Sequence, residues 1–101
     1  MWHPHGLTSS GKITTSTSAV WAMPGTLCEV DVSPPDSGIA VVTLYDNPSA
    51  ASGTVLALLE IASGTTSANE WVGPVVANKG IYAAVTGVTT GVEVVVKFMA
   101  G

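Results

Sequence analysis

Hydrophobic and polar residues alternate with a period of two along several short segments of this chain, which is the pattern of half-buried β-strands. The clearest case is residues 92–98, where Glu93 and Lys97 mark the polar face. Four residues form the opposite, apolar face: Val92, Val94, Val96 and Phe98. This segment is therefore predicted to be a strand with one side in the core.

Residues 27–32 follow the same rule in the first half of the chain. Cys28, Val30 and Val32 are predicted to share the buried face, and Glu29 and Asp31 to point the other way. Cys28 is the only cysteine, so no disulfide within the chain is possible. We interpret it as a small core residue because of its apolar surroundings.

The remaining strands are predicted from β-branched and apolar runs between turn residues. They are residues 12–20, 39–45, 54–61, 71–77 with an interruption at Pro74, and 81–86. Residues 54–61 also fit a short helix, but eight residues between two glycines favour a strand. Glycine, proline, asparagine and serine predict turns at 22–25, 33–38, 78–80 and 87–91. The last turn predicts that residues 81–86 and 92–98 pair as a C-terminal hairpin.

About seven short strands with turns every 8 to 12 residues predict an all-β fold, an antiparallel β-sandwich of jelly-roll-like kind. A chain of 101 residues supports one domain. Residues 1–11 show no periodicity and contain glycine and proline, so we interpret them as an N-terminal arm. Residues 12–101 are predicted to form the single β-sandwich domain.

The composition makes some classes of partner improbable. Charged residues make up 10% of the chain, against roughly 25% in typical soluble domains. Because the chain has few charges, electrostatic repulsion between copies is weak, and a homo-oligomer is expected. The net charge is −4, with three lysines and no arginine, which argues against nucleic-acid binding and anionic membrane surfaces. No apolar run approaches the roughly 18 residues that span a bilayer, and the first residues lack the pattern of a secretory signal.

No constellation of catalytic residues is present in the sequence. The two histidines, His3 and His5, both fall in the arm, where a base would not be held precisely. No nucleotide-binding loop, calcium loop or zinc-ligand spacing occurs. The sequence therefore predicts a protein that is not an enzyme and has no catalytic residues, cofactor or metal.

Aromatic residues give the candidate contacts. Trp2 is a large apolar ring in a polar arm, and Trp21 and Met23 adjoin the turn at Pro24. Buried aromatic and methionine side chains are common anchors at interfaces, so these three residues are predicted to contact a partner. Trp71 has two readings, a cap at the end of the sandwich or an aromatic platform for a sugar.

The stretch LYDNPSAASG, residues 44–53, is predicted to be a corner between two strands. Asp46 and Asn47 are expected to hydrogen-bond to the backbone that follows them, and Pro48 fixes one φ angle. Its polar side chains then satisfy backbone groups that leave the sheet, which is a folding role.

Four pieces of the chain resemble small β-sandwich structural proteins of tailed bacteriophages, of the head decoration or cement type. The pieces are Thr43 to Asn47, Ser52-Gly53, Gly80-Ile81-Tyr82 and Gly91 to Phe98, so the likeness covers roughly the last two thirds. The resemblance implies a structural role without catalytic residues. It implies binding to the outer surface of the assembled head, where the protein bridges subunits of the major capsid protein and stabilises the shell.

The same resemblance implies a compact oligomer, with a trimer as one form, made in the host cytoplasm and located on the capsid exterior. Two alternatives stay open. A tail or head–tail connector protein would share the fold and form rings. A carbohydrate-binding β-sandwich module would use Trp71 beside Asn69 and Glu70.

Overall fold

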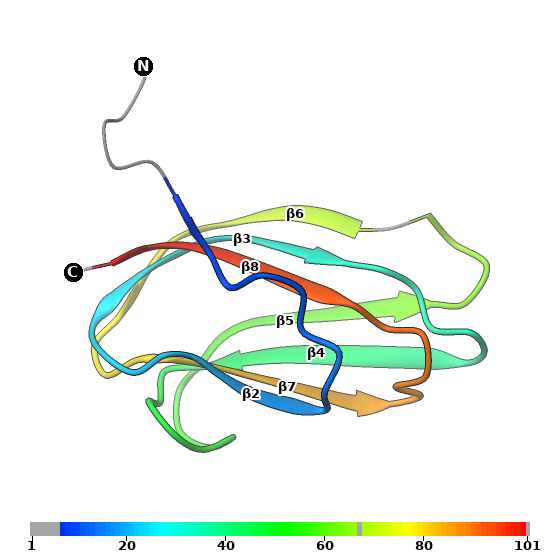
Figure 1. Cartoon of the computed structure of the whole chain (residues 1–101), viewed down its shortest axis with the longest axis horizontal. Coiled ribbons are helices and arrows are strands. Elements are labelled where there is room, and N and C mark those ends of the chain that lie inside the picture. Colours follow the sequence, from blue (N-terminus) through cyan, green and yellow to red (C-terminus); the bar gives the residue numbers. More distant parts are fainter. Residues whose placement is uncertain (1–6, 67, 101) are drawn as a thin grey trace.

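The computed structural model describes residues 7–66 and 68–100, with the backbone alone for residues 68–71. Eight strands lie in these residues and no helix. They are β1 (Thr8–Ser9), β2 (Thr17–Trp21), β3 (Gly25–Val32), β4 (Ile39–Tyr45), β5 (Val55–Ala62), β6 (Ala68–Ala77), β7 (Ile81–Gly87) and β8 (Val94–Ala100). They form two antiparallel sheets of four strands, stacked as two layers (Figure 1).

The strand order is that of a jelly roll. One sheet has the order β1-β8-β3-β6 and the other β2-β7-β4-β5. The chain therefore behaves as one long antiparallel ribbon, with β4 beside β5, β3 beside β6, β2 beside β7 and β1 beside β8. Rolling this ribbon up lets each sheet bury one face against the other. The predicted fold class is confirmed, with eight strands where about seven were expected.

The predicted C-terminal hairpin is wrong. β7 pairs with β2 and β4, whereas β8 pairs with β1 and β3 in the other sheet. The connection over residues 88–93 crosses between the layers instead of reversing within one. Glycine at both ends of residues 87–91 indicates a turn but suits a hairpin and a crossover equally, so turn chemistry alone does not decide which sheet the next strand joins.

Residues 55–62 are a strand, as predicted, and no helix forms there. β6 is a single strand, but its pairing with β3 is interrupted at Pro74, as predicted: Leu27 pairs with Val75 and Glu29 with Trp71, which leaves residues 72–74 without a register partner. The missing N–H of proline is tolerated because β6 lies at the edge of its sheet. Opposite it, a β-bulge between Leu27 and Glu29 shifts the register of β3. Cys28 is buried at 1% exposed, as predicted for a small core residue, and Leu27, which was not assigned to the buried face, joins Val30 and Val32 in the apolar core cluster.

The core lies between the sheets and consists mainly of aliphatic side chains. Leu27, Leu44, Ile81 and Phe98 are among its largest fully buried members. The predicted apolar face of residues 92–98 is confirmed, because all four of its residues are buried. Trp21 closes one end of the core, with its ring centroid 5.4 Å from that of Phe98.

One flank of the sandwich is closed by the N-terminal segment. Residues 8 and 9, which fall within the predicted arm, pair with β8 as the edge strand β1. Ile13 exchanges two backbone hydrogen bonds with Val94, and its side chain is buried in the core. The N–H of Val85 then donates to the carbonyl of Ser16, so residues 10–16 connect the two sheets along this side.

Candidate association surface

The opposite flank has no such covering segment among the described residues. β6 ends one sheet, β5 ends the other, and the two strands contact each other across the layers. Both strands are long, at ten and eight residues. Each presents one edge of its backbone without a neighbouring strand, which is the arrangement that natural proteins usually shorten or protect with charge.

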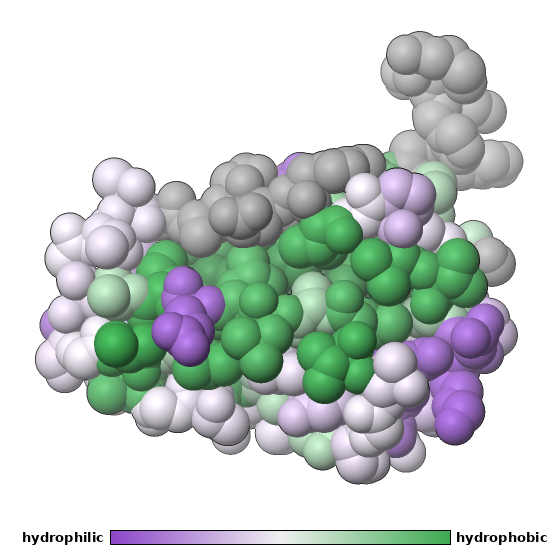
Figure 2. All heavy atoms as spheres, turned by 180° about the vertical axis from the view of Figure 1, so that it is seen from behind, coloured by the Kyte–Doolittle hydropathy of each residue, from purple (hydrophilic) through white to green (hydrophobic). Residues whose placement is uncertain are grey.

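The side chains of this flank are apolar. Seven of the larger ones on the two strands are exposed or half-buried: Val55, Leu56, Leu58, Leu59, Val72, Val75 and Val76. We call this set the open flank. The view from behind shows a broad hydrophobic area over these two strands (Figure 2). Leu58 is 57% exposed and Val76 65% exposed, so a single subunit leaves much of the open flank in contact with water.

Two residues of opposite charge lie near opposite ends of the open flank. Glu60 is the only charged residue of β5, is exposed, and lies near the C-terminal end of the strand. Lys79 is exposed in the turn between β6 and β7, at the end where β5 begins, because its N–H bonds to Asp46 and the Asp46 N–H bonds to Thr54. Neither side chain forms an ion pair with the part of the chain that the structure describes.

The open flank was not predicted from the sequence as a binding surface. The signal present was the run of apolar residues from Val55 to Leu59 with a single charge in the strand. That run was interpreted only as a strand, because a sequence pattern does not show that β5 lies at the edge of its sheet.

The three predicted partner contacts lie in different environments. Trp2 falls outside the described residues. Trp21 is half-buried, stacks at a tilt of 41° on Phe98 and donates a hydrogen bond of 3.2 Å from Nε1 to the Pro24 carbonyl. Met23 is 54% exposed in the turn between β2 and β3, which makes it accessible to a partner.

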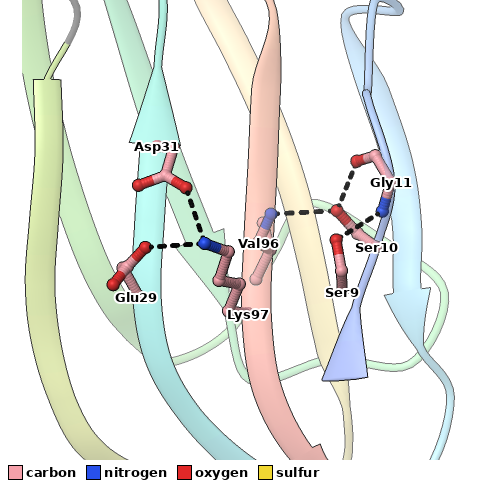
Figure 3. Close-up of polar contacts among 7 residues, drawn as sticks. All are labelled: Ser9, Ser10, Gly11, Glu29, Asp31, Val96 and Lys97. Atoms are coloured by element: carbon pink, nitrogen blue, oxygen red, sulfur yellow. Dashed lines mark hydrogen bonds and ion pairs between the residues drawn. The ribbon is translucent and has the colours of Figure 1, made fainter. Parts of the chain in front are cut away.

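A charged cluster lies on the outer face of the sheet formed by β1, β8, β3 and β6. The Nζ atom of Lys97 on β8 is 3.2 Å from Glu29 Oε2 and 3.4 Å from Asp31 Oδ2, both on β3 (Figure 3). The hydrogen bond to Glu29 raises the pKa of Lys97 above its ordinary value, and the charge of Asp31 adds to this effect. Lys97 forms ion pairs with both carboxylates across neighbouring strands. We therefore interpret the cluster as a contact that stabilises the sheet.

A shallow hollow of about 180 Å³ adjoins this cluster, beside the Lys12–Glu93 ion pair. Asp31 lines it, and the Oδ1 atom of Asp31 is buried without a hydrogen-bond partner in the described residues. The hollow is open to solvent, and 25% of the Asp31 side chain is exposed. These features do not make an enclosed binding site.

Asp46 has the most buried charged side chain of the described residues, at 9% exposed. Its carboxylate accepts hydrogen bonds from the backbone N–H groups of Asn78, Lys79 and Gly80. Burial is the largest single influence on its pKa and would raise it. The three N–H donors and the positive charge of Lys79 together outweigh burial and hold the pKa below 3.8.

This geometry corrects half of the predicted corner. Asn47 does bond to the backbone that follows it, with Oδ1 accepting from the N–H groups of Ser49 and Ala50 at 2.9 Å. Asp46 instead reaches a turn far along the chain. The residue is a structural tie between two turns, and its carboxylate is fully occupied by backbone donors.

The described residues hold few groups suited to chemistry. Cys28 is free and buried, and burial raises the pKa of its thiol above 9.0, with partial opposition from a backbone hydrogen bond at Met99. A thiol of that kind is a poor nucleophile. Among the side chains that the structure describes, those of residues 7–66 and 72–100, no cluster of three or more metal-ligating groups occurs. His3 and His5 lie outside these ranges.

Within the same part of the chain, no helix is long and apolar enough to cross a membrane. Comparison with known proteins identifies no relative: no family model matches this chain, and neither a curated protein nor a solved structure is detectably similar to it.

Proposed function

We propose that this protein is a structural virion protein of the head decoration type, which binds the outer surface of an assembled phage capsid and bridges its subunits. The observation that supports the proposal is a jelly roll with large apolar side chains exposed on it and few charges around them. Jelly rolls are common among viral capsid proteins. Exposed apolar side chains of this size are typical of surfaces that bind other proteins.

The mechanism is mechanical reinforcement. A protein bound across a boundary between two capsid subunits loses contacts if that boundary opens, so its binding free energy opposes expansion of the shell. Many copies on one lattice let a modest energy per contact suffice. Stiffness of the bound protein helps, and two antiparallel sheets packed on a common apolar core supply it.

The turn that carries Met23 is our proposed capsid contact, together with Trp2. Trp21 is committed to its own subunit by Phe98 and by the bond to the Pro24 carbonyl. It therefore acts as the support that fixes the turn, while the exposed Met23 side chain enters the capsid surface. A methionine suits this role because its flexible thioether adapts to the shape of a partner.

The test uses empty heads assembled from the major capsid protein encoded in the same genome. The purified protein is added, bound copies are counted by electron cryomicroscopy, and the temperature at which the heads disrupt is measured. We expect saturable binding and a higher disruption temperature. Absence of binding at concentrations that saturate known decoration proteins would refute the proposal, and rings formed by the protein alone would favour a tail or connector role.

Two variants locate the contact. Met23→Ser is expected to lower occupancy of the heads about tenfold, as loss of one central apolar anchor does. Ile39→Ser is the matched control, because Ile39 is 53% exposed but lies at the opposite end of β4 from the β2–β3 turn. Removal of residues 1–6 tests Trp2 while leaving β1 in place. Equal effects of Met23→Ser and Ile39→Ser would exclude the turn as the contact.

A further inference from the structure

β5 is the least protected edge strand of the fold. β1 has two residues, and residues 10–16 continue from it to cover that flank as far as β2. β6 contains Pro74, which cannot donate a hydrogen bond to an added strand. β5 has eight residues, no proline and a single charge. A strand of this kind is a ready template for pairing with a further strand.

The charges at the open flank indicate which strand it pairs with. Glu60 lies five residues beyond Val55, a distance of about 17 Å along a strand, while Lys79 lies at the Val55 end. A second copy that runs antiparallel along β5 brings its Glu60 toward Lys79 of the first copy, and the reverse contact follows by symmetry. A parallel copy would instead set the two Glu60 side chains beside each other.

We infer that β5 pairs antiparallel with β5 of a second copy of this chain about a two-fold axis, so that two four-stranded sheets join into one of eight strands. Such an interface is isologous, meaning that each subunit contributes the same surface. It brings the apolar side chains of the two β5 strands into contact with each other and gives the unpaired backbone groups of β5 their hydrogen bonds.

The pairing register follows from the alternation of side chains. Leu58 is opposite Thr43 and points outward, whereas Leu59 is opposite Val42 and packs against the core. A dimer that keeps both cores on the same side of the joined sheet must pair residues of like orientation. Leu58 lies near the middle of the strand, so the axis passes beside it, Leu58 meets Leu58 of the partner, and Glu60 falls near the partner's Val55 end.

This inference does not depend on capsid binding, because its tests use the purified protein alone. Sedimentation equilibrium of the wild-type chain is expected to show a reversible dimer. Leu58→Lys is expected to weaken the dimer at least a hundredfold. Thr86→Lys, at an exposed position of β7 two strands away from β5, is the control and is expected to leave it unchanged.

A charge exchange tests the orientation. Glu60→Lys and Lys79→Glu are each expected to weaken the dimer roughly tenfold, since both copies change at once and attraction becomes repulsion. The double variant is expected to recover wild-type affinity. Recovery requires that the two residues face each other between subunits, so failure to recover would contradict the antiparallel arrangement.

A cross-link tests the register without relying on affinity. In a Cys28→Ser background, Leu58→Cys is expected to oxidise to a covalent dimer, because cross-strand neighbours place their Cβ atoms about 4.5–5.5 Å apart. Ile39→Cys, of similar exposure, is expected to stay monomeric under the same conditions. A wild-type monomer at several hundred micromolar, a trimer, or a dimer that tolerates Leu58→Lys would overturn the inference. Circular dichroism verifies that each variant is folded.

Discussion

The carboxylate of Asp46 accepts a hydrogen bond of 2.8 Å from the backbone N–H of Lys79, 33 residues along the chain. Asn78 and Gly80 donate to the same carboxylate, so one buried side chain satisfies three consecutive backbone donors of the β6–β7 turn. The turn between the layers is thereby fixed against the end of β4. Within the polar stretch of residues 44–53, Asp46 therefore has a structural role at this junction.

Replacing Asp46 by alanine is expected to lower the free energy of unfolding by about 3 kcal/mol. Three N–H groups, one buried and two partly buried, would lose an ionised acceptor, and donors left without partners away from water are costly. Asp36→Ala is the matched control, because Asp36 is exposed, and its effect is expected to stay below about 0.5 kcal/mol. Urea unfolding of both variants measures the difference. Equal losses of unfolding free energy would show that the hydrogen bonds of Asp46 do not stabilise the fold as expected.

Asp46 also predicts a dependence of stability on pH. Because its pKa is lowered on folding, its contribution is complete above the unfolded-state pKa near 3.8 and is lost as the pH falls through the folded-state value. The stability gap between wild type and Asp46→Asn is therefore expected to be constant near neutral pH and to shrink below about pH 4. Unfolding curves from pH 7 to pH 2 measure the gap. A gap that is the same at both ends of this range would rule out the ionised carboxylate as its source.

Ser10 is expected to stabilise the edge of β8. Its Oγ accepts from the N–H of Val96 at 2.9 Å and donates to the carbonyl of Gly11 at 2.7 Å (Figure 3). Ser10→Ala should cost about 1 kcal/mol and speed hydrogen exchange at the Val96 amide. Ser9→Ala removes only an exposed bond to Gly11 and serves as the comparison. Identical exchange at Val96 in the two variants would contradict this role.

Trp21 is expected to act on the stability of a single subunit. Trp21→Ala removes the packing on Phe98 and the bond to Pro24, and a loss of about 3 kcal/mol is expected. Trp21→Phe, which keeps an aromatic ring but not the Nε1 donor, should lose less. If thermal unfolding of the monomeric Leu58→Lys background were unaffected by Trp21→Ala, the residue would instead be a direct partner contact.

The sequence predicted the elements of this fold better than their arrangement. Alternation located the strands around Val30 and Val96 because burial on one face leaves a period of two. It did not locate β1, whose two exposed residues bury nothing and so leave no pattern. The predicted strand at residues 12–20 begins at Thr17, since Ile13 enters the core from an irregular segment.

Long-range relationships were beyond the reach of the pattern. The bond from Asp46 to Lys79, the placement of β7 and β8 in different sheets, and the edge position of β5 all depend on which strands meet. A local sequence contains the turn residues but not the partner. For the same reason the outer position of Leu58 was visible only in the fold, although its apolar neighbours were visible in the sequence.

The ribbon-like pairing of the strands has a consequence for folding kinetics. β4 and β5 are joined by residues 46–54 alone, whereas the β1–β8 ladder encloses nearly the whole chain, and closing a longer loop costs more entropy. We expect the strand pairs to form in order of increasing loop length, from β4–β5 first to β1–β8 last. Val42→Ala should then slow folding, whereas Val96→Ala, at an equally buried position, should mainly speed unfolding. Stopped-flow measurements separate these rates, and the last ladder to close would be the one that joins the two ends of the chain.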